Sequence, residues 1–315
     1  MTFHKRFDTI VVMLKVGIVG VGKLGKIHLR IYSEIEIIET IYLADSNPEA
    51  VAEYPDYKYF ADYRQLKDKV DLVSIAAPTS NHYEIASFFL NHKIPVLVEK
   101  PLTQNENEAK KIVALSKKNK TLLFVGHVER YNSAYLAIKK TIKDPLFIEC
   151  HRLNPYPGRS IDISVVLDLM IHDLDIILGL MKDKVKKVEA KGVNVISPTA
   201  DIANARLTFK KGCVANITSS RISEKKERKI RIFMSNCYIS LDYAQQTVEI
   251  YRKNKNEIVK RCLPINKEEP LKREIVDFVR LVKTKKFSLD YAKRAKNALI
   301  LACKIDSRIN KQTNR

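Results

Sequence analysis

Apolar and polar residues follow two different periods along the first 125 residues of the chain. Short runs rich in Val and Ile, apolar on both faces, predict buried strands at 14–20, 37–45, 71–78, 94–100 and 121–127. Segments of helical period predict helices at 23–34, 82–92 and 105–118. The first of these helices has Leu24, Ile27 and Ile31 on one face. Buried strands alternating with helices predict a doubly wound α/β domain with a parallel sheet.

The pattern changes after residue 125, where strands follow one another with few helices between them. Strands are predicted at 146–154, 185–195, 201–209, 212–221, 228–235, 237–243 and 246–253. Helices are predicted at 132–143, 167–175, 270–284 and 288–306. Ala203, Ala205 and Leu207 alternate with the polar Asn204 and Arg206, which is typical of a sheet covered on one face. The second half therefore predicts an α+β domain with an open, mostly antiparallel sheet.

A glycine pattern follows the first predicted strand directly. Gly20, Gly22 and Gly25 form G-x-G-x-x-G at the start of the first helix, with Lys23 and Leu24 in the same turn. The first glycine permits a tight turn, the second lets the backbone approach a pyrophosphate, and the third lets helix and strand pack closely. In this strand-turn-helix context the pattern predicts that all five residues bind a dinucleotide.

The second strand ends at Asp45, 20 residues after Gly25. An acidic side chain at this distance accepts hydrogen bonds from the ribose hydroxyls of the adenosine. It also repels a 2′-phosphate, and Ser46 and Asn47 follow without an adjacent Arg. The cofactor is therefore predicted to be NAD. With a length of 315 residues, two domains are expected: an NAD-binding Rossmann domain at 13–125 and a domain for substrate binding and oligomerisation at 126–310.

The chain carries a net charge of +20, from 56 Lys and Arg against 36 Asp and Glu. The basic residues are dispersed along helical segments and are not interleaved with aromatics, so a solvated surface is favoured over nucleic-acid binding. The five cysteines are at least 24 residues apart and form no C-x-x-C pair, which suits free thiols in the cytoplasm. No apolar run approaches the ~18 residues of a membrane span. Neither nucleic acid nor a membrane is a predicted partner.

The stretch LDLMIHDLD, residues 167–175, places Asp168 and His172 one helical turn apart. A metal site needs at least three converging ligands, and a single His with carboxylates on its own helix does not supply them, so no metal is predicted. Asp173 points about 100° away from His172 on an ideal helix. Asp175 is expected to have a capping or pairing role. Taken alone, Asp168 and His172 fit either an acid/base pair or a solvated polar pair.

The chain resembles the glucose-fructose oxidoreductase and inositol dehydrogenase (Gfo/Idh/MocA) family. Beyond the glycine motif, four patterns carry the resemblance, in chain order: Ala77-Pro78-Thr79-x-x-His82, Glu99-Lys100-Pro101, the run VGHVERYN at 125–132 and the D-x-x-x-H of Asp168 and His172. In that family the Lys of E-K-P points at the nicotinamide and the reacting hydroxyl, and its Pro often follows a cis peptide.

The resemblance implies a role for each of these residues. Lys100 holds and polarises the substrate oxygen, His172 takes the hydroxyl proton, and Asp168 orients the imidazole or contacts the sugar. Additional contacts to NAD are implied for residues of the two earlier motifs: Ala77, Pro78, Thr79, His82, Glu99 and Lys100. His127 and Glu129 serve the same cleft or buttress it.

The runs GHVERYN and RLNPYPGRSIDISVVLDLMIHDLD are similar to the branch of the family that oxidises the carbon 3 hydroxyl of UDP-N-acetylglucosamine. This branch often has a glycine where the chain has Ser164. Diphosphate and uracil call for cationic and polar contacts. Substrate contacts are expected, beside His172, from Arg130, Tyr131, Asn132, Arg152, Asn154 and Arg159.

The resemblance also implies an aminotransferase partner that uses the keto product. The open sheet face favours self-association as a homodimer or homotetramer. Three alternatives stay open: a UDP-N-acetylglucosaminuronate dehydrogenase, an inositol or free-sugar dehydrogenase, and a non-catalytic protein that binds a dinucleotide or a polyanion.

Overall fold

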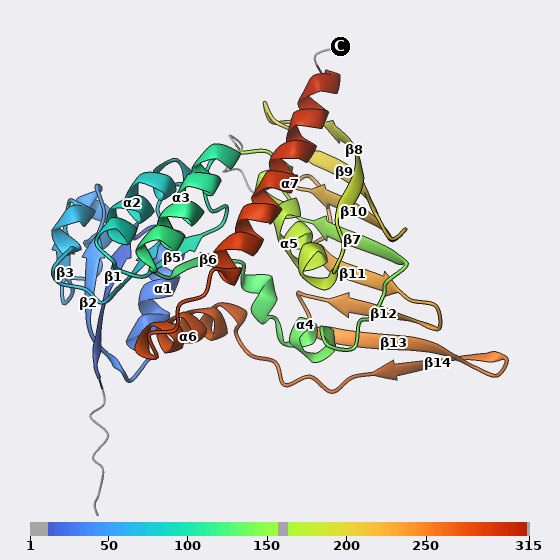
Figure 1. Cartoon of the computed structure of the whole chain (residues 1–315), viewed down its shortest axis with the longest axis horizontal. Coiled ribbons are helices and arrows are strands. Elements are labelled where there is room, and N and C mark those ends of the chain that lie inside the picture. The colour runs from blue at the N-terminus through green and yellow to red at the C-terminus, as the bar shows by residue number, and fades with distance from the viewer. Residues whose placement is uncertain (1–11, 157–162, 314–315) are drawn as a thin grey trace, which may run out of the picture. The chain divides into compact units, whose positions relative to one another are not determined.

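The computed structural model describes residues 12–156 and 163–313. The chain divides into two compact units (Figure 1), neither continuous in sequence. Within the described ranges, the first comprises the residues up to 99, 114–124 and 275–289, and the second comprises 100–113, those between 125 and 274, and those from 290 onward. The domain boundary at residue 125 stays a prediction, and the structure adds that the segment 275–289 groups with the first unit. This segment belongs to the first unit, where Phe278 packs its ring against Phe124 at a centroid distance of 5.5 Å.

The first unit contains a six-stranded sheet of order β3-β2-β1-β4-β5-β6. Its strands are β1 (Leu14–Val19), β2 (Ile38–Ala44), β3 (Lys58–Phe60), β4 (Leu72–Ile75), β5 (Val96–Glu99) and β6 (Leu123–Gly126). β1 pairs in parallel with β2 and β4, as do β2 with β3 and β4 with β5. This is the strand order of a Rossmann fold, in which ligands bind at the carboxyl ends of the strands. The predicted doubly wound sheet is confirmed.

Three helices connect strands of this sheet: α1 (Lys23–Ser33), α2 (Thr79–Asn91) and α3 (Glu106–Asn119), with short 3-10 turns η1 (Pro48–Val51) and η2 (Tyr63–Leu66). A later helix, α6 (Pro270–Lys283), follows β14 in the chain, and most of it belongs to this unit. The predicted apolar face of α1 is partly wrong. Leu24 is 42% exposed, whereas His28, Leu29 and Tyr32 are buried. The short β3 and the two 3-10 turns were not predicted, because this polar stretch has neither a strand nor a helix period.

The second unit contains an eight-stranded sheet of order β14-β13-β12-β11-β7-β10-β9-β8. Its strands are β7 (Phe147–Leu153), β8 (Val185–Val193), β9 (Ile202–Phe209), β10 (Val214–Ser220), β11 (Glu227–Phe233), β12 (Cys237–Asp242), β13 (Thr247–Asn254) and β14 (Glu257–Cys262). Only β7 and β10 pair in parallel among its described neighbours; the other pairs are antiparallel. The predicted open sheet is confirmed, with β14 as a further, mostly exposed strand.

One face of this sheet is covered by helices, as Figure 1 shows for α5 (Ile171–Leu180) and α7 (Asp290–Thr313). Ala203, Ala205 and Leu207 are buried on β9, while Asn204 and Arg206 are exposed, as the alternation predicted. Two short helical elements follow β6, η3 (Val128–Tyr131) and α4 (Ser133–Ile138). The predicted helix at 167–175 begins with a π-helical turn, η4 (Val166–Met170), which continues into α5. No helix in the described ranges has the length and apolar character needed to cross a membrane.

Candidate active site

The glycine turn after β1 has the shape that a pyrophosphate requires. Gly20 has φ +88°, and a Cβ there would lie 2.5 Å from the backbone nitrogen of Ala77. A Cβ on Gly25 would collide with the carbonyl oxygen of Gly20, so this glycine lets α1 begin directly against the strand end. No atom lies within 4 Å of the Cβ position of Gly22. The turn thus leaves open space at the N-terminus of α1, where backbone N–H groups and the helix dipole favour an anion.

Asp45 lies at the carboxyl end of β2 and is held against this turn. Its Oδ2 accepts a hydrogen bond of 2.7 Å from the backbone N–H of Val21, and its Oδ1 accepts one of 2.9 Å from Asn47. The side chain is half-buried, and an ionised carboxylate has about four acceptor positions. Acceptor capacity therefore remains for two ribose hydroxyls, and the residues of this unit fit NAD.

Replacing Asp45 with Asn should lower the preference for NAD over NADP by about 10- to 100-fold, because the change keeps the shape but removes a charge that binds hydroxyls and repels a phosphate. The ratio of kcat/KM for the two cofactors measures this preference. The matched control is Asp68→Asn, at an exposed aspartate of the same unit. An unchanged ratio in the Asp45 variant would show that this carboxylate does not select the cofactor.

The motif after β4 supports the turn from within. The ring Nε2 of His82 donates a 2.9 Å hydrogen bond to the carbonyl oxygen of Ala77. Pro78 is the N-cap of α2, and Thr79 is its first residue. Because His82 is 1% exposed, the structure assigns it to holding the Ala77 turn rather than to open cofactor surface.

The carboxylate of Glu99 lies in a buried polar cluster that the sequence did not reveal. His28, which is fully buried on α1, places Nε2 2.9 Å from Glu99 Oε1 and Nδ1 2.7 Å from Ser74 Oγ. The cluster ties α1 to the ends of β4 and β5. Glu99, which is predicted to contact NAD, thus bonds His28 of α1 in this structure. Lys100 follows it directly in the chain. The signal that could have identified His28 is its spacing of three residues from Gly25, on the same helix face.

Lys100 and Asp168 form the central contact of the second unit. Lys100 Nζ donates to the backbone oxygen of Asp168 at 2.9 Å and to its carboxylate Oδ1 at 2.8 Å. The two side chains keep 19% and 27% of their surface exposed. The peptide bond between Lys100 and Pro101 is cis, as expected. The structure thus brings together residues 68 positions apart, with an ammonium fixed at a partly open position.

His172 lies on α5, one turn after Asp168, and is half-buried. Its Nδ1 is buried and has no hydrogen-bond partner among the described residues, while the carboxylate of Asp168 binds Lys100. In this structure Asp168 therefore orients the ammonium of Lys100 and makes no hydrogen bond to the His172 imidazole nitrogen Nδ1. Burial and the nearby charge of Lys100 hold the pKa of His172 well below 6.5. The imidazole is therefore neutral at physiological pH and can accept a proton.

His127 lies beside His172, with its ring perpendicular and the centroids 6.4 Å apart. Its two ring nitrogens are buried and unpartnered among the described residues. Burial lowers the pKa of His127 to about 4. Of the two roles considered for this residue, a wall of the site that supports His172 fits its 1% exposure.

Three of the predicted substrate residues make structural contacts. Arg130 forms a buried bidentate pair with Asp175, with N–O distances of 2.7 and 2.6 Å. Arg152 bonds both carboxylate oxygens of Asp173 and also Glu129. Asn132 caps α4 through Ala134 and donates to the carbonyl of Tyr243. The guanidiniums of Arg130 and Arg152 are both buried and neutralised by carboxylates, and direct substrate contact by these residues stays a prediction.

The remaining substrate predictions lie in different places. Tyr131 and Asn154 are half-buried, at the end of η3 and just after β7. Arg159 lies outside the described residues. A further cation, Arg228 on β11, was missed, because the basic residues were interpreted together as solvated surface. Its charge contributes to the lowered pKa of His172, and the charge of Asp168 in turn acts to raise the pKa of Arg228.

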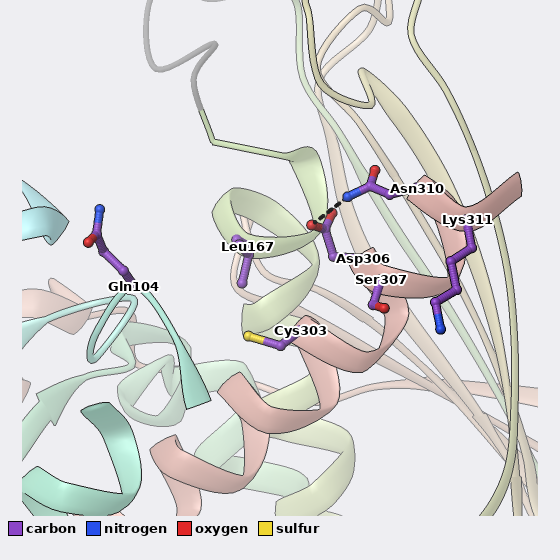
Figure 2. Close-up of a pocket in the computed structure, with 7 residues that line it drawn as sticks. All are labelled: Gln104, Leu167, Cys303, Asp306, Ser307, Asn310 and Lys311. Carbon is purple, nitrogen blue, oxygen red and sulfur yellow. Dashed lines mark hydrogen bonds between the residues drawn. The ribbon is translucent and has the colours of Figure 1, made fainter. Parts of the chain in front are cut away.

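A shallow pocket borders the π-helical turn on the side of α7 (Figure 2). Leu167 points into it, next to Cys303, and Asn310 donates to Asp306 at 3.4 Å. Asp168, the next residue, reaches Lys100 instead. The consecutive residues Leu167 and Asp168 therefore point to different places, Leu167 into the pocket and Asp168 toward Lys100. Neither Lys100 nor His172 lines the pocket.

A Rossmann unit with a dinucleotide turn, together with a fixed lysine and a neutral histidine, defines an oxidoreductase that transfers hydride to NAD. Comparison with known families agrees. Residues 14–127 match the model of the oxidoreductase family with an NAD-binding Rossmann fold, and residues 139–240 match the GFO/IDH/MocA C-terminal domain. The chain belongs to the Gfo/Idh/MocA oxidoreductase family.

Among curated proteins, the chain is 32% identical over 279 residues to the UDP-N-acetylglucosamine 3-dehydrogenase of Acidithiobacillus ferrooxidans, covering 85% of this chain and 88% of that one. A solved structure of that enzyme, GnnA, superposes with a TM-score of 0.89 at 29% identity, over 96% of this chain and all of the other. The myo-inositol 2-dehydrogenase of Thermotoga maritima is 25% identical over 75% of this chain and 78% of its own length.

Proposed function

We propose that this protein oxidises the carbon 3 hydroxyl of UDP-N-acetylglucosamine to a ketone, with NAD as the oxidant. The observation that carries the proposal is the Lys100, Asp168 and His172 cluster, in a chain 32% identical to a UDP-N-acetylglucosamine 3-dehydrogenase over most of its length. A lysine and a neutral histidine supply the two functions that oxidation of a secondary alcohol requires, a cation for the oxygen and a base for its proton.

Bound NAD supplies the acceptor for the hydride that leaves carbon 3. Gly20, Gly22 and Gly25 would hold its pyrophosphate, and Asp45 its adenosine ribose. Lys100 directly follows the last residue of β5, at the carboxyl end of a strand of the Rossmann sheet, where dinucleotides bind in such folds.

The ammonium of Lys100 binds the substrate oxygen and stabilises the negative charge that develops on it. Asp168 is a positioning residue, because it holds that ammonium through two of its own oxygens. His172 accepts the hydroxyl proton. The surrounding positive charges favour the neutral imidazole before reaction and also favour an alkoxide at the substrate oxygen.

The lowered pKa of His172 predicts how the rate depends on pH. A base must be neutral to act, and burial with Lys100 nearby keeps His172 neutral to below pH 6.5. The acid limb of kcat/KM should therefore fall below pH 6.5, with the rate maintained down to that value. A pH profile with substrate and NAD measures this limb, and His172→Asn should lose at least ~100-fold in kcat. An acid limb centred above pH 6.5 would contradict the assignment of the base.

The proposed activity is tested by incubating the purified protein with NAD and a panel of UDP-N-acetylglucosamine, UDP-N-acetylglucosaminuronate and myo-inositol. Absorbance at about 340 nm reports reduced cofactor. A tightly held cofactor would limit the signal, so 2-oxoglutarate is added in parallel as a recycling acceptor. Turnover of UDP-N-acetylglucosamine above the others supports the proposal. Turnover of the uronate or of inositol alone, or of none, would refute the substrate.

A ketone at carbon 3 is the substrate that a sugar aminotransferase needs, so such an enzyme is the proposed partner, in the cytoplasm. For the assembly, we propose a homodimer or homotetramer through the face of the second sheet opposite α5 and α7. Half-exposed Glu149, Arg231 and Phe233 lie on that face, and an antiparallel sheet of this kind often buries one face against a second copy. Light scattering after gel filtration should report a multiple of the chain mass of 36.2 kDa. The mass of one chain would contradict this proposal.

A further inference from the structure

Arg228 lies on the covered face of β11, and its charge acts on His172. The antiparallel register places Arg228 directly opposite Arg152 of β7. Arg228 shares its face of the strand with Ile230 and Ile232, which are each 1% exposed beneath the covering helices. Lys229, the next residue, lies on the opposite face. The register therefore brings two guanidinium groups together on the covered side of the sheet.

The two arginines differ in what neutralises them. Arg152 is bound to Asp173 and Glu129. Arg228 has no ion-pair partner among the described residues, and its buried Nε has no hydrogen-bond acceptor there. The carboxylates whose charges reach Arg228 are engaged elsewhere, Glu129 and Asp173 by Arg152 and Asp168 by Lys100.

This arrangement is unfavourable without an anion. Burial and the like charge of Arg152 lower the pKa of Arg228, which means that the cation is destabilised where it lies. An incoming oxyanion would satisfy the guanidinium, and a phosphate suits it particularly well, because two N–H groups can bond two oxygens in one plane. The charge of Arg228 acts on His172, the proposed base, and the charge of Asp168 acts on Arg228, so an anion bound to Arg228 would lie in the neighbourhood of the proposed reaction.

We propose that Arg228 binds the diphosphate of the nucleotide sugar and thereby selects phosphorylated sugars over free polyols. This inference rests on the proposed function, because it assigns part of the same substrate site. It replaces Arg130 and Arg152, whose guanidiniums are occupied, as the source of positive charge for the diphosphate.

Binding of UDP without any sugar isolates this contact from catalysis. Titration calorimetry of the NAD-loaded protein should show that Arg228→Gln weakens UDP binding by about 10- to 100-fold, the loss expected for charge-assisted hydrogen bonds. Lys229→Gln, one residue away on the other face, is the matched control and should change the affinity by less than twofold. The melting temperature of Arg228→Gln without UDP should equal or exceed that of the wild type, since a like-charge contact is removed. A structural role for Arg228 would lower it.

The outcomes separate the two claims. If the wild type binds UDP and Arg228→Gln binds it equally well, the inference is wrong while the proposed function stands. If the variant loses affinity only for UDP-N-acetylglucosaminuronate, Arg228 recognises the hexose carboxylate and the diphosphate assignment is wrong. If the wild type does not bind UDP, the nucleotide-sugar substrate itself is refuted.

Discussion

Replacing Lys100 with Met should lower kcat by about 100- to 1000-fold, the loss expected when a donor to a developing oxyanion is removed. Met retains the apolar stem but no charge, so the substrate oxygen loses its cation. Asp168 also loses the ammonium that bonds two of its oxygens. Binding of NAD should change little, because the glycine turn and Asp45 are untouched. Steady-state kinetics at saturating substrate and NAD measure the effect.

The matched control for this prediction is Lys110→Met. Lys110 is an exposed lysine that forms an i,i+4 pair with Glu106 on α3, and pairs of this kind contribute only about 0.3–0.5 kcal/mol. Its kcat should stay within about twofold of the wild type. If Lys100→Met is folded, binds NAD and keeps more than a tenth of the wild-type kcat, Lys100 does not stabilise the reacting oxygen.

Replacing Arg152 with Met should destabilise the protein by about 3–5 kcal/mol, because it leaves two carboxylates in the interior without their cation. Arg152 is 2% exposed, and it bonds Asp173 at 2.9 and 3.0 Å and Glu129 at 3.0 Å. The loss in the free energy of unfolding should be larger at neutral pH than at acidic pH, because both carboxylates are ionised in the unfolded chain at neutral pH. Thermal unfolding followed by circular dichroism measures the shift.

Arg206→Met is the control for Arg152, since Arg206 is exposed on β9 and bonds only Asn216 there among its described neighbours. It should shift the free energy of unfolding by less than about 0.5 kcal/mol. This pair of variants also decides between two interpretations of Arg152. An Arg152 variant as stable as the wild type, with a raised KM for the sugar, would restore the substrate contact predicted from sequence and contradict the buried pair.

The fold could be predicted from the sequence because the patterns that specify it lie within single strands, helices and turns. Strands apolar on both faces specify a parallel sheet, and alternating residues such as Ala203 and Asn204 specify a half-covered one. The glycine turn and Asp45 were found because their roles depend on backbone geometry within a single strand-turn-helix unit. Lys100 and His172 were found through a family resemblance, since no spacing connects residues so distant along the chain.

The partners of the arginines could not be predicted in this way. Arg130 and Asp175 are 45 residues apart, and Arg152 and Asp173 are 21 apart. Sequence alone does not show which face of β7 is covered or how it is paired with β11. The same register distinguishes Arg228 from Lys229 within one basic run. A π-helical turn also has no simple sequence signal, and it determines where Asp168 points.

In the proposed reaction, hydride leaves carbon 3 of UDP-N-acetylglucosamine for NAD at the Lys100 and His172 site. The most direct measurement uses UDP-N-acetylglucosamine with deuterium on carbon 3 and mass spectrometry of the reduced cofactor. We expect the reduced cofactor to carry the deuterium, and Lys100→Met to form far less of the labelled cofactor. Reduced cofactor without the label, or a sugar product that retains deuterium at carbon 3, would contradict the account.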